Sequence, residues 1–341
     1  MFAKLQFLVV LLSIGVQGRP HLPHILSSVW HDVISPNITL GREAKEWRPH
    51  SADAAAVPDL FLPPRAPILR NFPDTNTQNM AVTAFFDALN LAFSGYKALM
   101  GQCKPGWQPP ATYLRYFPPE PEDARGSVQD ALLAVIGPSP YGPAEMDEPG
   151  YSFAIYYEEV VDVPESIAEL DQRMCSHNDP PNAYFGESDE DSAAWMVICP
   201  KTFENQKDLS HTTCEELPDG ATAAMDVPGA TVLHEFLHWH RMTTNIGTLE
   251  IVDYNIDDLG INLIDPKAWP KTGYGPENAQ ALNEVFQRWD PSDMSEEHLT
   301  RAPWLNADNY VYFCLESYWE EKCAGKHFGD APRPPPINAL R

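Results

Sequence analysis

The chain has 341 residues, of which 43% are hydrophobic, so it can bury a sizeable core in one large domain or two smaller ones. Its 48 acidic residues outnumber the 23 basic ones and give a formal net charge of −25 at pH 7. Nucleic acids and anionic membranes bind positively charged surfaces, so this composition argues against both as partners.

The first 18 residues have the composition of a secretory signal peptide. Lys4 precedes an apolar stretch at residues 5–16, and small residues follow with an expected cleavage after Gly18. The apolar stretch is short for a membrane span. We therefore expect a secreted protein.

Secretion changes the interpretation of the cysteines. An even number of cysteines without a C-x-x-C pair predicts three disulfides in an oxidising compartment, with the pairing left open. Asn37 begins a glycosylation sequon, Asn-Ile-Thr, which predicts a glycoprotein. The six cysteines are Cys103, Cys175, Cys199, Cys214, Cys314 and Cys323.

Residues 19–75 are rich in proline, histidine and arginine and show no lasting period, which predicts an extended arm or a pro-segment. From 77 to 102, apolar residues recur at steps of three and four, which is typical of a helix. A second helix is expected at 121–137, where Gly137 and a proline end it.

The middle of the chain alternates between strands and loops. Near-alternating aromatic and β-branched residues predict a strand at 150–161, and a short helix follows at 164–174. Residues 178–192 are an expected acidic loop, and 193–200 form an expected strand. A polar loop is expected at 201–228.

The last third of the chain is expected to be mostly helical, with helices at 276–289 and 307–322. A proline-rich tail follows at 329–341. We predict one α+β domain over residues 76–328.

The stretch "TVLHEFLHWH" contains the strongest motif, in which Glu235 follows the first of two histidines. On a helix His234 and His238 lie one turn apart on one face, so both can reach one metal ion. Imidazole nitrogens suit Zn²⁺. Glu235 is rotated by about 100° from His234 and can take a proton from a zinc-bound water.

The neighbouring residues support a helix here. Pro228 and Gly229 precede the helix, Asp226 is a possible cap, and Asn245 and Gly247 can end it. The competing interpretation is an amphipathic helix with two incidental histidines. The opposite face, expected to pack inward, consists of Leu233, Phe236, Leu237 and His240.

A catalytic zinc ion takes three protein ligands, so one ligand remains to be found. A third histidine in the pattern H-E-x-x-H-x-x-G-x-x-H is excluded, because Arg241 and Thr244 stand at the required positions. Glu277 or Glu284 is open in principle. The other option is an aspartate soon after the motif helix.

In that region the chain resembles the deuterolysin-type metallopeptidases, or aspzincins. The segments "HEFLHWH", "GTLEIVDY", "TGYGPENAQAL" and "NADNY" carry the resemblance, which extends over about residues 77–320 through looser matches such as "WMVICPKTF". The family pattern is H-E-x-x-H followed by G-T-x-D-x-x-Y-G, whose aspartate is the third zinc ligand. The resemblance implies a zincin-like fold with a small sheet and long helices.

The chain departs from this pattern, because Glu250 stands at the position of the family's aspartate and Asp253 follows it. The Tyr-Gly pair appears only later, as Tyr274 and Gly275, which we interpret as an insertion between ligand and tyrosine. Asp253 is our choice of ligand. The alternatives, in order, are Glu250 and then Asp257 or Asp258.

By the same resemblance Tyr274 would donate a hydrogen bond to the oxyanion of the transition state, with Tyr254 as its substitute. The segment at 306–310 would have a structural role or would support the metal ligands.

These observations predict a secreted, monomeric zinc metalloendopeptidase that binds one Zn²⁺ and acts on proteins or peptides. One alternative is a non-catalytic secreted zinc-binding protein, a scavenger or antigen, on the same scaffold. Another is a disulfide-stapled adhesion or binding module in which the motif is coincidental. The presence of Glu235 favours the enzyme.

Overall fold

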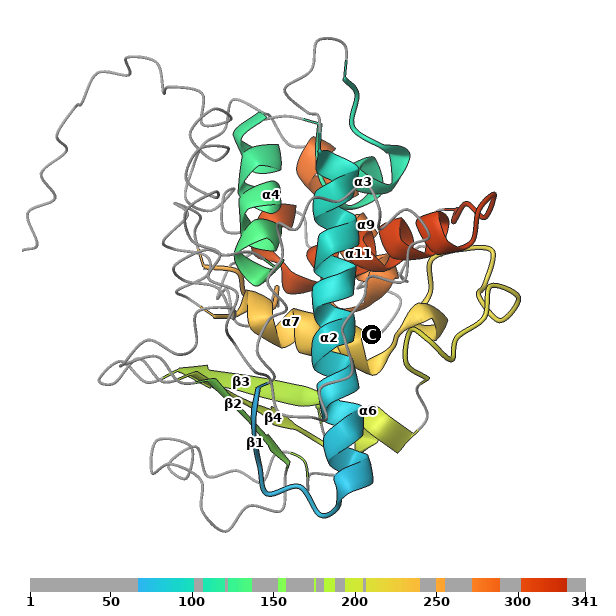
Figure 1. Cartoon of the computed structure of the whole chain (residues 1–341). Helices are drawn as coiled ribbons and strands as arrows, with labels where there is room; N and C mark the ends of the chain where they lie inside the picture. The colour runs from blue at the N-terminus through green and yellow to red at the C-terminus, as the bar shows by residue number, and fades with distance from the viewer. Residues whose placement is uncertain are drawn as a thin grey trace, which may run out of the picture. The chain divides into compact units, whose positions relative to one another are not determined.

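The computed structural model describes eleven stretches of the chain, all within the second of two compact units, residues 47–341 (Figure 1). The stretches are 67–100, 107–119, 122–136, 153–157, 175, 181–187, 194–204, 207–239, 250–254, 272–288 and 302–329. The expected signal peptide, the Asn37 sequon, the helix at 164–174 and the tail beyond 329 lie outside them. The domain boundaries stay predictions.

The described residues form an α+β fold, as the sequence predicted. The strands are β1 (Ile68–Arg70), β2 (Phe153–Tyr157), β3 (Ala183–Glu187) and β4 (Ala194–Ile198). The α-helices are α2 (Thr75–Leu99), α3 (Ala111–Tyr116), α4 (Glu122–Ile136), α6 (Lys201–Glu204), α7 (Pro228–Leu237), α9 (Gly275–Arg288) and α11 (Ala307–Lys322). Two 3₁₀ turns, η5 (Ala223–Met225) and η6 (Pro303–Leu305), complete the set.

The four strands form one sheet in the order β1-β2-β4-β3. Strands β1, β2 and β4 are parallel, whereas β3 runs antiparallel to β4 and lies at the edge, with Ala183 opposite Ile198. β4 is buried along its whole length, as expected for a strand flanked on both sides. The edge strand β3 contacts α7, so it lies near the motif helix.

Helix α2 packs against α7, α11 and α4 and organises the core (Figure 1). Asp74 begins it by accepting a hydrogen bond from Thr77 N at 2.8 Å, a standard N-cap. Along its buried face, Phe85 meets Phe236 of α7 edge-to-face, with ring centroids 5.6 Å apart. Helix α7, which carries the motif, therefore packs against α2, the longest helix among the described residues.

Several elements differ from the sequence-based expectations. The predicted polar loop at 201–228 contains α6 and η5, and α7 ends at Leu237, before the expected end near Asn245. β1 lies within the range predicted to be an arm, and α3 was not predicted. The expected acidic loop at 178–192 is wrong for residues 183–187, which form β3. The backbone of this segment pairs with the buried strand β4, and the acidic residues that dominate the composition lie to its C-terminal side.

The structure contains two disulfides, Cys175–Cys199 and Cys214–Cys323. Both fit an oxidising extracellular environment. The expectation of three is not met within the described residues, because Cys314 is a free buried thiol and Cys103 lies outside them. In the part of the chain that the structure describes, no helix is long and apolar enough to cross a membrane.

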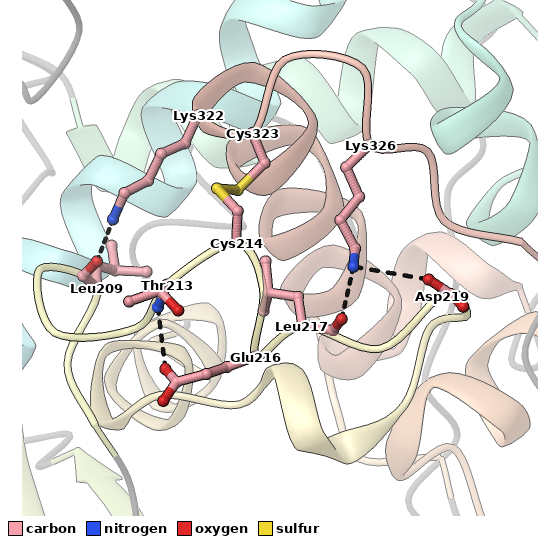
Figure 2. Close-up of a disulfide and its surroundings, with 9 residues drawn as sticks. All are labelled: Leu209, Thr213, Cys214, Glu216, Leu217, Asp219, Lys322, Cys323 and Lys326. Atoms are coloured by element: carbon pink, nitrogen blue, oxygen red, sulfur yellow. Dashed lines mark hydrogen bonds and ion pairs between the residues drawn. A yellow bond between two sulfur atoms is a disulfide. The ribbon is translucent and has the colours of Figure 1, made fainter.

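Figure 2 shows how the Cys214–Cys323 disulfide anchors the segment before α7 to the end of α11. Lys322 donates to the carbonyl oxygen of Leu209, and Lys326 Nζ donates to that of Leu217 at 2.5 Å. The chain segment that precedes α7 is thus attached to the end of α11 and the residues after it at Leu209, Cys214 and Leu217.

Candidate metal centre

Helix α7 carries the motif and is built from mostly buried residues. Its N-cap, Val227, makes no side-chain cap bond, and Pro228 occupies the first turn, where its missing N–H costs nothing. The predicted cap by Asp226 is wrong, because that carboxylate accepts a hydrogen bond from Tyr312 Oη at 3.2 Å instead. The face predicted to pack inward is buried at Leu233, Phe236 and Leu237, and His240 lies outside the described residues.

His234 and His238 lie side by side at the C-terminal end of this helix. Their Nε2 atoms are 3.2 Å apart, and His238 is the C-cap residue. Asp253 Oδ1 lies 2.9 Å from His234 Nε2 and 3.3 Å from His238 Nε2. Two imidazole nitrogens and one carboxylate oxygen therefore converge on one point. These are the three residues that the motif and the family resemblance picked out as candidate ligands.

The spacing of these three atoms fits a bound metal ion. In a tetrahedral site with bonds of about 2.0–2.1 Å, ligand atoms lie about 3.3 Å apart. The distances of 2.9, 3.2 and 3.3 Å approach that value. The side chains of His234, His238 and Asp253 are 12%, 18% and 34% exposed, so the group is sheltered but reachable. It can hold one metal ion.

Hydrogen bonds on the far side of each ring determine which nitrogen faces that point. His238 Nδ1 lies 3.0 Å from the carbonyl oxygen of Ile251, which only accepts, so Nδ1 donates. His234 Nδ1 is 2.6 Å from Asp308 Oδ1, and this carboxyl oxygen is the acceptor in the same way. With Nδ1 protonated, each ring turns its Nε2 toward the other two groups, where that nitrogen can hold a proton or, in the neutral ring, bind a metal ion.

Asp253 Oδ1 is the unsatisfied atom of the site. It is buried, and its close contacts with the two imidazoles are poorly aligned for hydrogen bonding. A buried carboxylate oxygen beside two imidazole nitrogens is costly unless a proton or a metal cation lies between them. The donor set therefore fits a metal ion on chemical grounds as well as on distance.

The local charges favour a cation at the same place. Burial opposes a charge on His234, but the carboxylates of Asp308 and Asp253 outweigh it and raise the pKa of that imidazole well above its usual range. Burial likewise opposes the charge on Asp253, but the two imidazoles lower the pKa of this carboxyl. The negative charges of these carboxyl groups favour a positive charge at His234 Nε2, whether it is a proton or a metal cation.

Glu235 lies beside the ligands and is 7% exposed. Burial raises the pKa of its carboxyl, against the opposing influence of His234 and His238. A raised pKa makes a carboxyl group a better proton acceptor, and the proton it has accepted can then be passed on.

Asp253 lies on a short segment, residues 250–254, that is hydrogen-bonded to the start of α11. Val252 N donates to Leu305 O at 2.8 Å, and Ala307 N donates to Val252 O at 3.1 Å. Tyr254 N donates to the side chain of Asn306 at 3.0 Å. These bonds fix the backbone on both sides of the ligand.

Tyr274 and Gly275 complete the site from the start of α9. Tyr274 Oη donates to Asp253 Oδ2 at 2.6 Å, and its ring stacks on His234 at a centroid distance of 5.9 Å. Gly275 has a φ of 84°, a conformation that favours glycine, and its N–H donates to Asp308 Oδ2 at 2.6 Å. Tyr274 and Asp253 thus meet although they are 21 residues apart.

A cleft of about 330 Å³ opens on the side of His238. One wall is the edge strand β3 and the other is the segment that carries Asp253. The lining residues are Phe185, Gly186, His238, Glu250, Ile251, Val252 and Asp253.

The other candidate ligands do not join the group. Glu250 is exposed and lines the cleft, while Glu284 on α9 pairs with Arg288 at 3.0 Å. Glu277 lies in the first turn of α9 and is absent from the ligand group. Asp257 and Asp258, the remaining alternatives, lie outside the described residues.

Sequence reasoning did not find the partners of the two histidines. Ile251 contributes only a backbone oxygen, which no motif reveals. Asp308 belongs to a segment for which a supporting role was expected, but 74 residues separate it from His234, so their contact could not be predicted.

No model of a known protein family matches the chain, and no curated protein matches its sequence. The geometry of the site therefore carries the argument for function.

Proposed function

We propose that this protein is a secreted zinc metalloendopeptidase with a zincin-like fold, of the deuterolysin or aspzincin type. The observation that carries the proposal is the convergence of His234 Nε2, His238 Nε2 and the unsatisfied Asp253 Oδ1 within 2.9–3.3 Å. Two imidazoles and one carboxylate form a three-ligand set typical of catalytic zinc, which keeps a fourth position for water. One Zn²⁺ per chain follows.

When bound, zinc would supply a Lewis acid that polarises a carbonyl group and lowers the pKa of water. Glu235 is the general base in this proposal, because it follows the first ligand on α7 and is buried beside the ligand set. It accepts a proton from the attacking water and returns one to the leaving amine. Its raised pKa suits both transfers.

The cleft supports a peptide substrate. β3 pairs with β4 on one side only, so among the described strands its other edge offers backbone groups for an extended chain. Phe185 and Gly186 of this strand line the cleft, and His238 and Asp253 lie at its other wall. A peptide laid along β3 would therefore pass beside the metal ligands.

The test is cleavage of an unfolded protein by the zinc-loaded, secreted protein, with products identified by mass spectrometry. Glu235→Gln removes the proposed base but leaves the three ligands. Glu250→Gln is the matched control, because it neutralises a carboxylate that lines the same cleft outside the ligand group. We expect the wild type and Glu250→Gln to cut, and Glu235→Gln to bind zinc with at least 100-fold lower turnover.

Two results would contradict the proposal. If all three proteins bind zinc and none cuts, the chain is a non-catalytic zinc-binding protein. If the wild type binds no zinc, the motif is incidental and a binding module becomes the better description.

A further inference from the structure

The two oxygens of Asp253 have different environments. Oδ2 accepts a hydrogen bond from Tyr274 Oη at 2.6 Å, whereas Oδ1 is buried, makes no well-aligned hydrogen bond and faces both imidazoles. A carboxylate rotates about its Cβ–Cγ bond and can present either oxygen or both. The bond from Tyr274 holds Oδ2 away from the ligand position and leaves Oδ1 there.

A tyrosine hydroxyl carries a single proton. In this structure that proton is donated to Asp253, so it is not available to an oxyanion at the same time. The position of the hydroxyl is itself constrained, because the ring stacks on His234 with an interplanar angle of 19°. Asn278 Nδ2 also donates to the Tyr274 carbonyl oxygen at 2.7 Å.

The next residue acts on a second ligand through Asp308. Gly275 N donates to Asp308 Oδ2 at 2.6 Å, and Asp308 Oδ1 is 2.6 Å from His234 Nδ1. Both oxygens of Asp308 are thus used, one by the turn and one by the ligand. The backbone of Gly275 reaches this position with a φ of 84°, a conformation that residues with a side chain disfavour.

We propose that the Tyr274–Gly275 turn positions two of the three metal ligands, Asp253 through the tyrosine hydroxyl and His234 through Asp308. Tyr274 is then a positioning residue for the ligand set and not the oxyanion donor that the family resemblance implies. The inference rests on the proposed metal centre, but it concerns metal affinity and not turnover.

The test measures zinc affinity of the full-length protein by competition with a chromophoric chelator, and the absorption of the Co²⁺-loaded protein. Tyr274→Phe removes one hydroxyl group from a half-exposed ring, so we expect this variant to fold. Tyr310→Phe is the matched control, because it also deletes a hydroxyl hydrogen bond, the 2.8 Å bond to Trp304 O, away from the ligands. Gly275→Ala tests the second half of the proposal.

We expect Tyr274→Phe and Gly275→Ala to weaken zinc binding by about 10- to 100-fold and to alter the Co²⁺ spectrum, as loss of ligand-supporting groups does. Tyr310→Phe should bind zinc like the wild type. Wild-type zinc affinity in Tyr274→Phe overturns the role of the tyrosine, and wild-type affinity in Gly275→Ala overturns that of the glycine.

These outcomes are distinct from a failure of the proposed function. A wild type that never cuts, combined with weakened zinc binding in Tyr274→Phe, contradicts the peptidase and supports the positioning role. A wild type that cuts, combined with a Tyr274→Phe variant that binds zinc normally but turns over slowly, supports the oxyanion role and refutes the positioning role.

Discussion

Gly229 of α7 lies directly against Asp87 of α2. A Cβ atom placed on Gly229 would lie 2.4 Å from Asp87 Cβ and 3.0 Å from Ala88 N, distances that real side chains do not adopt. The two helices therefore cross in backbone contact, five residues before the first metal ligand. This close contact sets the separation between α7 and α2.

Gly229→Ala should destabilise the protein by about 1–3 kcal/mol, because the added methyl group has to push the helices apart. The matched control is Gly126→Ala in α4, where nothing lies within 4 Å of an added Cβ. That variant should be neutral or more stable by about 0.5–1 kcal/mol, since alanine favours a helix interior. Urea unfolding gives the free energy of unfolding of both variants. Equal changes in Gly229→Ala and Gly126→Ala would contradict the close contact between α7 and α2.

Asp87 makes the stability of the metal-free protein depend on pH. Burial raises the pKa of its carboxyl to about 7, against the hydrogen bond that it accepts from Leu209 N, whereas an unfolded aspartate titrates near about 3.9. Between these values the folded state holds a proton that the unfolded state has lost. The contribution of the protonated Asp87 carboxyl to the free energy of unfolding is fully present below about pH 4 and is lost as the pH rises through about 7.

Asp87→Asn should therefore flatten the stability profile between pH 5 and 7, by up to about 1.4 kcal/mol per pH unit. Urea unfolding in the presence of a chelator gives the profile. Asp219→Asn, at a fully exposed side chain, should run parallel to the wild type. Parallel profiles for Asp87→Asn and the wild type would show that Asp87 is ionised in the folded protein.

Metal binding should stabilise the folded state. A ligand at about 1,000 times its dissociation constant adds about 4 kcal/mol, so excess Zn²⁺ should raise the melting temperature measured by calorimetry. His238→Ala should lose most of this shift, because it removes one of three ligands. The shift should also be smaller at pH 5 than at pH 7.5, since protons compete for the imidazoles. An unchanged shift in His238→Ala would place the metal elsewhere.

The two disulfides should differ in their contribution to stability. Cys214–Cys323 spans 109 residues and Cys175–Cys199 spans 24. Loop-closure entropy predicts that replacing the first pair by alanine costs about 1 kcal/mol more than replacing the second, within a range of about 2–5 kcal/mol for each. Denaturant unfolding of the two double variants gives the comparison. The reverse order would show that native contacts, not loop length, decide the difference.

The histidine pair was predictable because helical spacing alone places residues four apart on one face. His234 and His238 obey this rule, and their Nε2 atoms lie 3.2 Å apart. The proposed third ligand was not fixed in this way. Asp253 competed with five other carboxylates, because spacing in an irregular segment or on a distant helix does not determine geometry. What selects it is the pairing of residues 251–254 with the start of α11, a non-local contact.

The same distinction explains the fold. The helices α2, α4, α9 and α11 were recognised from their own periodicity and end within a few residues of the expected positions. Strand β3 was missed because its sequence, "AYFGE", lies in an acid-rich stretch and becomes a strand through its partner β4. Gly186 illustrates this dependence, since an added Cβ there would lie 2.4 Å from the Trp195 indole of β4.

One hydrogen bond, from Gly273 N to Tyr254 O at 2.7 Å, joins the two places where the chain leaves the ligand segment and returns to it. Asn306 reinforces the junction from both sides. The two ends of any chain inserted between Tyr254 and Gly273 are therefore already held together, and each doubling of a flexible insertion should cost only about 0.6 kcal/mol in closure entropy. New sequence introduced between these two residues should leave the centre beside them intact.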